Sequence, residues 1–210
     1  MIKRLFFFVA VVIILNGCGV RYITPKPQYT WPEMASSKIG DSLGIYIPPE
    51  NLYLIYKSSE SDDCCEHKGI RLGQGIVKAV MASSKAVFDK AVLLGEKPSD
   101  TYIKALNLRG LLHVKDVVIE LEFVPHIEDH SKGKSDVMYR VIITLSLNLT
   151  AIDFTLSDIR DFNLDIQIES DEPAAKKQIN KLLQELTTKA LERLADELAR
   201  KLVTIYGARA

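Results

Sequence analysis

Two adjacent cysteines and a histidine mark the segment of the chain with the most reactive side chains, "SDDCCEHKG" (residues 61–69). Thiolate and imidazole groups are preferred ligands of zinc and copper, so Cys64, Cys65 and His67 are candidate metal ligands. The spacing is unfavourable, because neighbouring cysteines point in different directions and no CxxC or HxxxH pattern lies on this loop. A solvated polar loop is the interpretation that we favour.

A second polar group lies further along the chain at "HIEDH", where His126 and His130 enclose a glutamate and an aspartate. If the fold brought this segment to Cys64, Cys65 and His67, the two groups together would offer sulfur, nitrogen and oxygen ligands. Because a metal site would require these two separate segments to meet, a metal-binding protein is the least favoured functional hypothesis. No cofactor is predicted.

The sequence carries no common catalytic motif. It lacks the GxSxG, HExxH and Walker phosphate-loop patterns. The segment "GIRLGQG" (Gly69–Gly75) opens a predicted helix, where free N–H groups can bind an anion, but it follows a loop rather than a strand. A turn explains its glycines better. Asp158, Asp161 and Asp165 fall in a turn and on the polar face of a strand, where solvation explains them. We therefore predict that the protein is not an enzyme.

The N-terminus has the pattern of a secretory leader. Lys3 and Arg4 precede an apolar run from Leu5 to Leu15, and a small residue follows. The run is too short for a membrane-spanning helix, which needs about 20 apolar residues. Residues 1–17 are therefore predicted to be a signal peptide.

The end of the leader, Leu15-Asn16-Gly17-Cys18, resembles the lipobox of bacterial lipoproteins. The resemblance implies that Cys18 becomes the acylated first residue of the mature chain, and several acyl chains hold a protein durably on a bilayer. Gly19 rather than Asp follows the cysteine. In Gram-negative lipoproteins this implies sorting to the outer membrane, with the body facing the periplasm. An ordinary signal peptide and an uncleaved anchor remain as alternatives.

Acylation of Cys18 would leave Cys64 and Cys65 as the remaining thiols, in an oxidising compartment. They could form a strained vicinal disulfide, bond to another chain or stay free, and the sequence does not choose among these states. Replacement of both by serine is expected to leave folding nearly intact.

The charge balance argues against a nucleic-acid partner. The chain of 210 residues carries 27 basic and 27 acidic residues, and loss of Lys3 and Arg4 with the leader leaves 25 basic against 27 acidic. This small net negative charge supplies no electrostatic attraction to a phosphate backbone. A hydrophobic content of 47% is that of a globular chain with a substantial core.

Residues 18–42, which contain three prolines, are predicted to form an extended tether between the acylated Cys18 and the body. Two aromatic residues in it, Tyr29 and Trp31, have alternative places, either docked on the body or at lipid headgroups. Residues 43–210 are predicted to form a single domain of ordinary size.

Hydrophobic spacing predicts a broken strand, a helix, three antiparallel strands and a long closing helix. The expected ranges are 43–57, 72–94, 113–127, 136–154, 161–170 and 174–206. Both helical ranges carry apolar stripes three and four residues apart, so both should pack on one face of the sheet, with a coiled coil as the alternative for the last. The predicted fold is α+β, a two-layer domain with a mainly antiparallel sheet and two helices.

The acylated cysteine, the tether and this order of elements resemble small Gram-negative envelope lipoproteins. These are the YajG-like lipoproteins, the lipopolysaccharide-assembly lipoprotein LptE and the auxiliary lipoproteins of lipid-transport ABC systems. The segments that carry the resemblance are "LGIYIP", "GIVKAVMASSKAVFDKAV", "VVIELEFVP" and "ALERLADELARKL". The resemblance covers nearly the whole mature chain as an order of elements, and Cys18 is the one residue whose role it transfers.

The leading functional hypothesis is a membrane-anchored, non-enzymatic accessory that binds a partner protein in envelope assembly or transport. It predicts an exposed apolar patch or an unpaired sheet edge. The alternative is a periplasmic lipoprotein that binds a lipid or a small hydrophobic molecule. That function requires an enclosed apolar pocket of about 300–1,000 Å³ between sheet and helices.

Overall fold

The structure is a computed structural model that describes residues 21–29, 38–57, 68–127 and 137–207. Most of these residues belong to a six-stranded sheet with the strand order β5-β2-β6-β7-β8 and a short β9 paired with β7. The strands are β2 (Ile39–Tyr46), β5 (Phe88–Leu94), β6 (Gly110–Ile127), β7 (Val137–Asp153), β8 (Asp158–Glu169) and β9 (Ala174–Ala175). β2 is parallel to both β5 and β6, whereas the pairs formed by β7 with β6, β8 and β9 are antiparallel.

Alternating apolar residues build the inner face of this sheet. Leu145 of β7 pairs with Ile119 of β6 on one side and with Ile166 of β8 on the other, so one row of apolar side chains crosses three strands. The alternation predicted for β7 is confirmed, because its inward residues are almost fully buried. They are Val141, Ile143, Leu145, Leu147 and Leu149.

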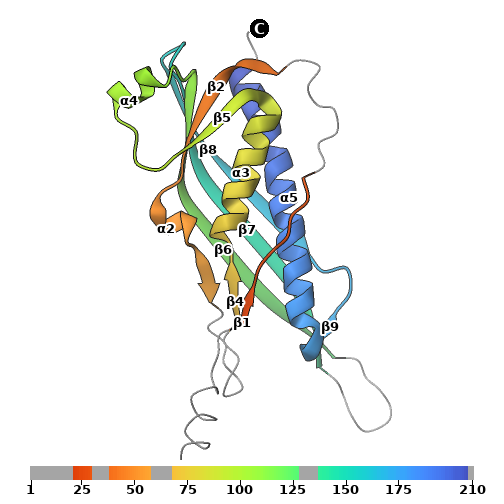
Figure 1. The fold of residues 1–210 in the computed structure, drawn as a ribbon. Helices are drawn as coiled ribbons and strands as arrows, with labels where there is room; N and C mark the ends of the chain where they lie inside the picture. The colour runs from red at the N-terminus through yellow and green to blue at the C-terminus, as the bar shows by residue number, and fades with distance from the viewer. Residues whose placement is uncertain (1–20, 30–37, 58–67, 128–136, 208–210) are drawn as a thin grey trace, which may run out of the picture.

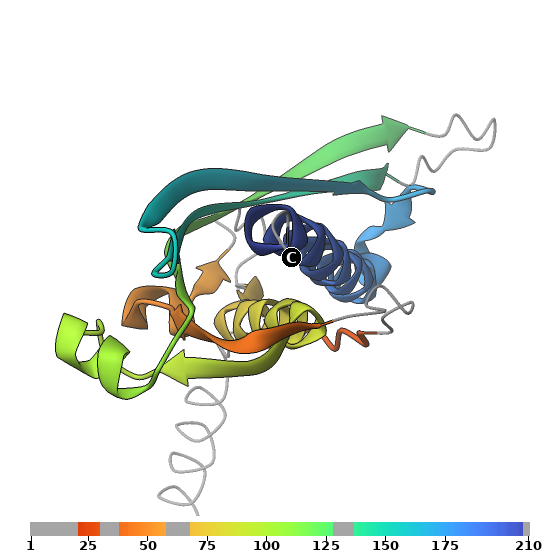
Figure 2. The ribbon, with the colours of Figure 1, turned by 90° about the horizontal axis from the view of Figure 1, so that it is seen from above.

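Two helices, α3 (Gly73–Val87) and α5 (Ile179–Tyr206), cover this inner face (Figures 1 and 2). The buried stripe of α5 contains the apolar positions that the spacing predicts, including Leu186, Leu194 and Leu202. Packing on the sheet and on α3 therefore accounts for the stripe, and a coiled coil is not needed. Although α5 is long, no helix in the described ranges is both long and apolar enough to cross a membrane.

Two predicted helix boundaries are wrong. The helix predicted over residues 72–94 ends at Val87, and Phe88–Leu94 form β5 beside β2. A short apolar run fits a strand as well as a helix, and pairing with β2 decided between them. The helix predicted from residue 174 starts at Ile179, because Ala174–Ala175 pair with β7 and Lys176–Gln178 form a single 3₁₀ turn.

A second, smaller sheet has the strand order β1-β4-β3. It consists of β1 (Arg21–Ile23), β3 (Ile55–Lys57) and β4 (Lys68–Arg71), with β1 parallel and β3 antiparallel to β4. β3 falls in the range predicted as the second half of the first strand. A short helix, α2 (Pro49–Leu52), separates it from β2 and has a proline at its first position, where no N–H is needed.

The remaining helix, α4 (Asp100–Ala105), lies on the outer face of the large sheet. Ser99 caps it, since the Ser99 Oγ accepts a hydrogen bond from the Tyr102 N–H at 3.3 Å. The described residues thus contain four α-helices and two sheets with mixed strand directions. The predicted α+β class is confirmed. The finer prediction of a mainly antiparallel sheet with two helices is met only in part, because β2 enters the sheet in parallel and α2 and α4 are added.

Residues 21–29, which we call the strap, are extended and lie against the body. The Lys26 N–H donates to Thr188 Oγ1 at 3.2 Å and the Gln28 N–H to Glu192 Oε1 at 2.8 Å. Tyr29 is half-buried, and burial, with a smaller effect of Glu192, raises the pKa of its hydroxyl. Of its two predicted places, Tyr29 occupies the one docked on the body.

Candidate functional site

We call the end of the body at which β7 and α5 finish and β6 begins the distal end (Figure 1). Gly110 at the start of β6 pairs there with Asp153 at the end of β7. The hydroxyl of Tyr206, the last residue of α5, donates to the carbonyl of Ile152 at 3.1 Å. This end carries two features that could serve a function, a polar network and an apolar groove.

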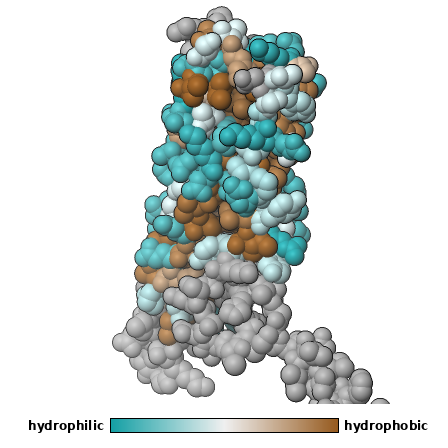
Figure 3. All heavy atoms as spheres, turned by 90° about the vertical axis from the view of Figure 1, so that its left-hand side faces the viewer, coloured by the Kyte–Doolittle hydropathy of each residue, from teal (hydrophilic) through white to brown (hydrophobic). Residues whose placement is uncertain are grey.

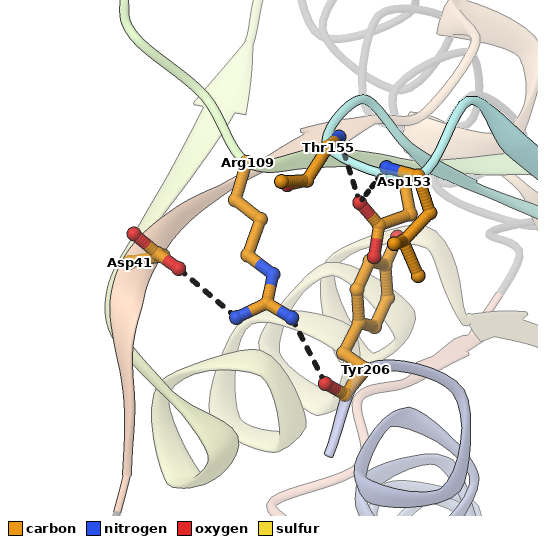
Figure 4. A network of polar contacts seen from close by, with 6 residues as sticks. Asp41, Arg109, Asp153, Thr155 and Tyr206 are labelled. Carbon is orange, nitrogen blue, oxygen red and sulfur yellow. Dashed lines mark hydrogen bonds and ion pairs between the residues drawn. The ribbon is translucent and has the colours of Figure 1, made fainter. Parts of the chain in front are cut away.

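Arg109 is the centre of the polar network (Figure 4). Its Nη1 donates to Asp41 Oδ2 of β2 at 3.0 Å, and its Nη2 donates to the backbone carbonyl of Tyr206 at 3.0 Å. Because the carbonyls at a helix C-terminus carry partial negative charge, the guanidinium stabilises the end of α5. The backbone of Arg109 also accepts a hydrogen bond from the Phe154 N–H at 2.9 Å.

Asp153 organises the turn between β7 and β8. Its side chain is buried, at 3% exposure of the residue, and its Oδ1 accepts hydrogen bonds from the N–H groups of Thr155 and Leu156 at 2.8 and 3.2 Å. Such side-chain acceptance of nearby amides is a common way in which aspartate fixes a turn. Two buried atoms, Asp153 Oδ2 and Arg109 Nε, have no hydrogen-bond partner among the described protein groups.

Tyr206 closes the network from the side of α5. Its ring meets Phe88 edge-on, with 5.1 Å between the ring centroids. A Cβ atom on Gly110 would lie 2.6 Å from the Ile152 carbonyl oxygen and 2.8 Å from the Tyr206 hydroxyl, so this close approach requires glycine. Burial raises the pKa of Tyr206; nearby Asp153 raises it further and Arg109 opposes the shift.

The groups of the network are occupied in holding elements of the fold together. Arg109 is engaged by Asp41 and by the end of α5, and the raised pKa keeps the Tyr206 hydroxyl protonated as a donor. Asp153 is shielded from solvent and holds two backbone amides. The hydrogen bonds of the network join β2, β7 and α5 at the distal end.

An open groove of about 440 Å³ lies beside α4. We call it the distal groove, and the residues that line it are Ile103, Lys104, Asn107, Leu108 and Phe154. Its floor belongs to a small apolar cluster on the outer face of the sheet. The buried members of this cluster are Leu94, Ile103, Leu108 and Leu111.

Two local features place α4 over the sheet. Asn107 has φ 49°, a left-handed conformation that asparagine tolerates better than most residues, and its N–H donates to the Lys104 carbonyl at 3.1 Å. The chain therefore turns sharply after α4 and directs Leu108 to the sheet. A Cβ atom on Gly44 of β2 would lie 2.7 Å from Leu108 Cδ1, so the bare backbone of Gly44 makes room for that side chain.

Apolar surface continues from the small cluster across the start of β8. Ile152, which packs on the cluster, pairs with Ile159, and Ile159 is 66% exposed. Leu156 in the adjoining turn and Tyr102 of α4 are also exposed. On the side seen in Figure 3, apolar atoms gather in an upper and a lower area with hydrophilic atoms between them. The distal groove is therefore part of an exposed apolar patch.

The space between the sheet and the two long helices, in contrast, is filled by side chains. Ile45 of β2, Leu112 of β6, Ile143 of β7 and Leu194 of α5 are fully buried there and belong to one apolar cluster. The distal groove lies on the other face of the sheet, so its position differs from the enclosed pocket that the ligand-binding hypothesis requires.

Most of the residues singled out in the sequence lie outside the described part of the chain. These are Cys18, Cys64, Cys65, His67 and His130. The backbone of His126 belongs to β6 and pairs with Met138 of β7. Within the described ranges, no three His, Cys, Asp or Glu residues are arranged to hold a metal ion. The metal-binding hypothesis for the cysteine and histidine segments stays a prediction.

The predicted solvation of the β8 carboxylates holds for Asp161, which is on the outer face and exposed. Its Oδ1 accepts from Lys115 Nζ at 2.8 Å and from Thr150 Oγ1 at 2.6 Å. The hydrogen bond from Lys115, followed by that from Thr150, lowers the pKa of Asp161. These contacts join strands of the outer face.

The sequence analysis missed α4, and with it the distal groove. The signals were short: Ser99 is a good N-cap residue, and Asn107 and Gly110 mark the turn that follows. A six-residue helix contains too few apolar positions to show a period, so only its capping residues could have revealed it.

Comparison with known proteins finds likeness in structure alone. No family model and no curated protein matches the chain. A protein from Xanthomonas campestris assigned to the DUF330 family is 10% identical, with a TM-score of 0.48, over 90% of this chain and 98% of that chain.

Two lipoproteins show the same kind of likeness. Uncharacterized lipoprotein B from Nitrosomonas europaea is 9% identical over 86% of this chain and 94% of that one, with a TM-score of 0.43. Rare lipoprotein B from Shewanella oneidensis is 11% identical over 79% and 98%, with a TM-score of 0.39. The chain is thus weakly similar to small Gram-negative lipoproteins, as the sequence resemblance predicts. Likeness at this level concerns the layout of the chain and gives no ligand or partner.

Proposed function

We propose that the protein is a bacterial lipoprotein, anchored through Cys18, that binds another protein of the cell envelope and carries out no reaction. The anchor rests on the apolar leader and on the lipobox-like residues Leu15–Cys18. Gly19 after the cysteine favours the outer membrane, with the folded body in the periplasm. This proposal makes the body a recognition module held at a membrane.

The observation that carries the recognition role is the exposed apolar patch around the distal groove. Ile159 and Tyr102 expose apolar surface to water. A partner that covered this surface would gain about 25 cal/mol for each Å² buried. The patch is open, and the charged residue Lys104 lines its groove. An apolar centre with a polar rim is the usual composition of a protein interface.

Site-specific photo-crosslinking in cells tests the recognition role. A photoreactive amino acid at Lys104, an exposed residue of the groove, is expected to yield a discrete adduct with an envelope protein. The matched control is the same amino acid at Gln167, which is exposed on the polar outer face of β8. Adducts at both positions alike, or at neither, would contradict a docking role for the groove.

The anchor has its own test. Cys18→Ser should abolish acylation and move the protein from the membrane fraction to an unprocessed or soluble form. Mass spectrometry of the mature N-terminus should find lipid on Cys18 in the parent chain. Unchanged membrane fractionation of the variant would count against the anchor.

The second candidate function is binding of a lipid or a small hydrophobic molecule in the distal groove. Its volume of about 440 Å³ and its lining by Ile103, Leu108 and Phe154 support this. Titration of the purified protein with a fluorescent fatty acid distinguishes the two functions. Saturable binding that Leu108→Ala weakens would favour the ligand, and its absence together with a crosslinked protein would favour the partner.

A further inference from the structure

The strap limits how far the body can stand from its anchor. Arg21 pairs with Lys68 in the parallel ladder between β1 and β4, so Arg21 is already part of the body. Three peptide units join Cys18 to Arg21, and chain geometry limits their reach to about 11 Å. A free tether over residues 18–42 would have allowed roughly 80 Å at full extension.

The strap also gives the direction of the body relative to the anchor. The carbonyl of Thr24 accepts from Gln184 Nε2 at 3.4 Å. Further along the strap, the N–H groups of Lys26 and Gln28 donate to side chains of Thr188 and Glu192. For every two residues along the strap, the contact on α5 moves forward by four residues. The strap therefore runs parallel to that helix.

The distal end consequently lies far from Cys18. From Gln184, beside Thr24, to Tyr206 at the end of α5 is a helical distance of about 33 Å at 1.5 Å per residue. β1 precedes Thr24 and lies at the opposite end of the body, with β4, as Figure 1 shows. We call this opposite end, where β1, β3 and β4 lie, the proximal end.

The proximal end presents side chains that suit a lipid surface. Tyr22 of β1 is 42% exposed, with the Arg71 guanidinium 4.6 Å from its ring. Ile55 of β3 is also exposed. Tyrosine rings are favoured at the boundary between headgroups and acyl chains. The ten residues of the small sheet include four basic and no acidic residues, while the connecting residues 58–67 contain four acidic ones. Orientation therefore depends on the anchor rather than on the net charge of this end.

From these observations we propose that the protein stands on the bilayer with its proximal end against the lipid, and presents the distal groove roughly 30–40 Å from the membrane surface. The inference rests on the proposed function, since it requires acylation of Cys18. It deepens that function because it places the partner of the groove in the periplasm, away from the anchoring leaflet, and excludes a lipid of that leaflet as the occupant.

Fluorescence quenching on vesicles tests the orientation. The mature, acylated full-length chain is reconstituted on phosphatidylcholine vesicles that contain a lipid with a quencher on its headgroup. A fluorescent amino acid is placed at Ile55 on the proximal end, or at Lys104 in the distal groove, and Tyr22 of β1 is a second proximal position if the Ile55 variant folds poorly. Quenching several-fold greater at the proximal positions than at Lys104 is the expected result. Equal quenching at both ends of a vesicle-bound protein would overturn the orientation.

Two controls separate the orientation from the anchor. Insertion of about twenty Gly and Ser residues between Gly19 and Val20 adds a flexible span of roughly 25 Å, and should reduce the difference between the two ends while the protein stays on the vesicles. Cys18→Ser should prevent sedimentation with vesicles altogether. Failure of the parent chain to sediment would overturn the anchor itself, whereas sedimentation without differential quenching would overturn only the orientation.

Discussion

The two faces of the six-stranded sheet differ in how they are covered. The inner face meets α3 and α5 along the length of the body, and its side chains join one large apolar cluster. The outer face of the same strands carries polar residues in the middle, such as Thr144, Ser146 and Asn148 of β7. At the distal end a short helix, α4, covers apolar residues of the outer face.

This difference separates side chains that stabilise the fold from side chains that face solvent. Successive residues of a strand point to opposite faces, so Leu145 can be fully buried while its neighbours Thr144 and Ser146 are in partial contact with solvent. Changes on the outer face therefore leave the inner cluster intact. The distal groove lies on the face with the smaller apolar cluster.

The largest effect is expected from truncation in the inner cluster. Leu194→Ala removes a fully buried side chain between α5 and the sheet and should lower the free energy of unfolding by about 2–5 kcal/mol. Leu108→Ala, in the four-residue outer cluster, should cost about 2 kcal/mol or less, since the site is next to the groove and partly open. Urea denaturation of the Cys18→Ser chain measures both. Equal losses would show that the two faces contribute equally.

Glycine substitution at the distal end should have the next largest effect. Gly110→Ala places a methyl group against the Ile152 carbonyl and the Tyr206 ring, both fixed, and should destabilise by about 1–3 kcal/mol. Gly95→Ala is the matched control, because no atom lies within 4 Å of a Cβ atom there. Thermal unfolding followed by circular dichroism would separate the two variants. A harmless Gly110→Ala would mean that α5 can move away from the sheet.

Acid should weaken the outer cluster before the inner one. His113, whose ring lies 5.0 Å from that of Tyr46, has its pKa lowered by burial and then by Lys115 and Lys97. Between this lowered pKa and the unfolded value of about 6.5, the unfolded chain binds a proton that the folded chain does not. Stability is therefore complete above pH 6.5 and falls as the pH drops through this window.

A pH series of urea unfolding, with His113→Gln as the comparison, measures this contribution of His113. The variant should lose the part of the pH dependence that arises in the window, and nuclear magnetic resonance of the His113 ring should report the lowered pKa directly. A ring that titrates at or above pH 6.5 would contradict its burial beside Tyr46.

The smallest effect on stability, and the sharpest on recognition, is expected for Ile159→Asp. The side chain is mostly exposed, so the free energy of unfolding should change by no more than about 0.5 kcal/mol. A charge in the apolar patch should nevertheless weaken the crosslink from Lys104 to a partner. Gln167→Asp, on the polar part of the same strand, is the control. Unchanged crosslinking in both would remove Ile159 from the docking surface.

Long periodic segments were predicted well because many positions report the same face. β7 alternates over 17 residues, and α5 keeps its buried stripe over 28, so each pattern specified its element and its inner face. Phe88–Leu94 was assigned to a helix because seven apolar-rich residues fit both periods. The candidate site was missed for the same reason, since α4 has six residues and the distal groove is lined by residues from α4 and from the β7–β8 turn.

The sequence by itself determined the α+β class and the side chains that line the core, and it predicts a leader with a lipobox-like end. These depend on composition and on spacing within one segment, which decide how apolar atoms leave water. Only the tertiary structure decided that β2 enters the sheet in parallel, that the strap binds β4 and α5, and that Gly44 receives Leu108. Such contacts join residues far apart in the chain, and their free energy depends on which surfaces meet after folding, which no local pattern records.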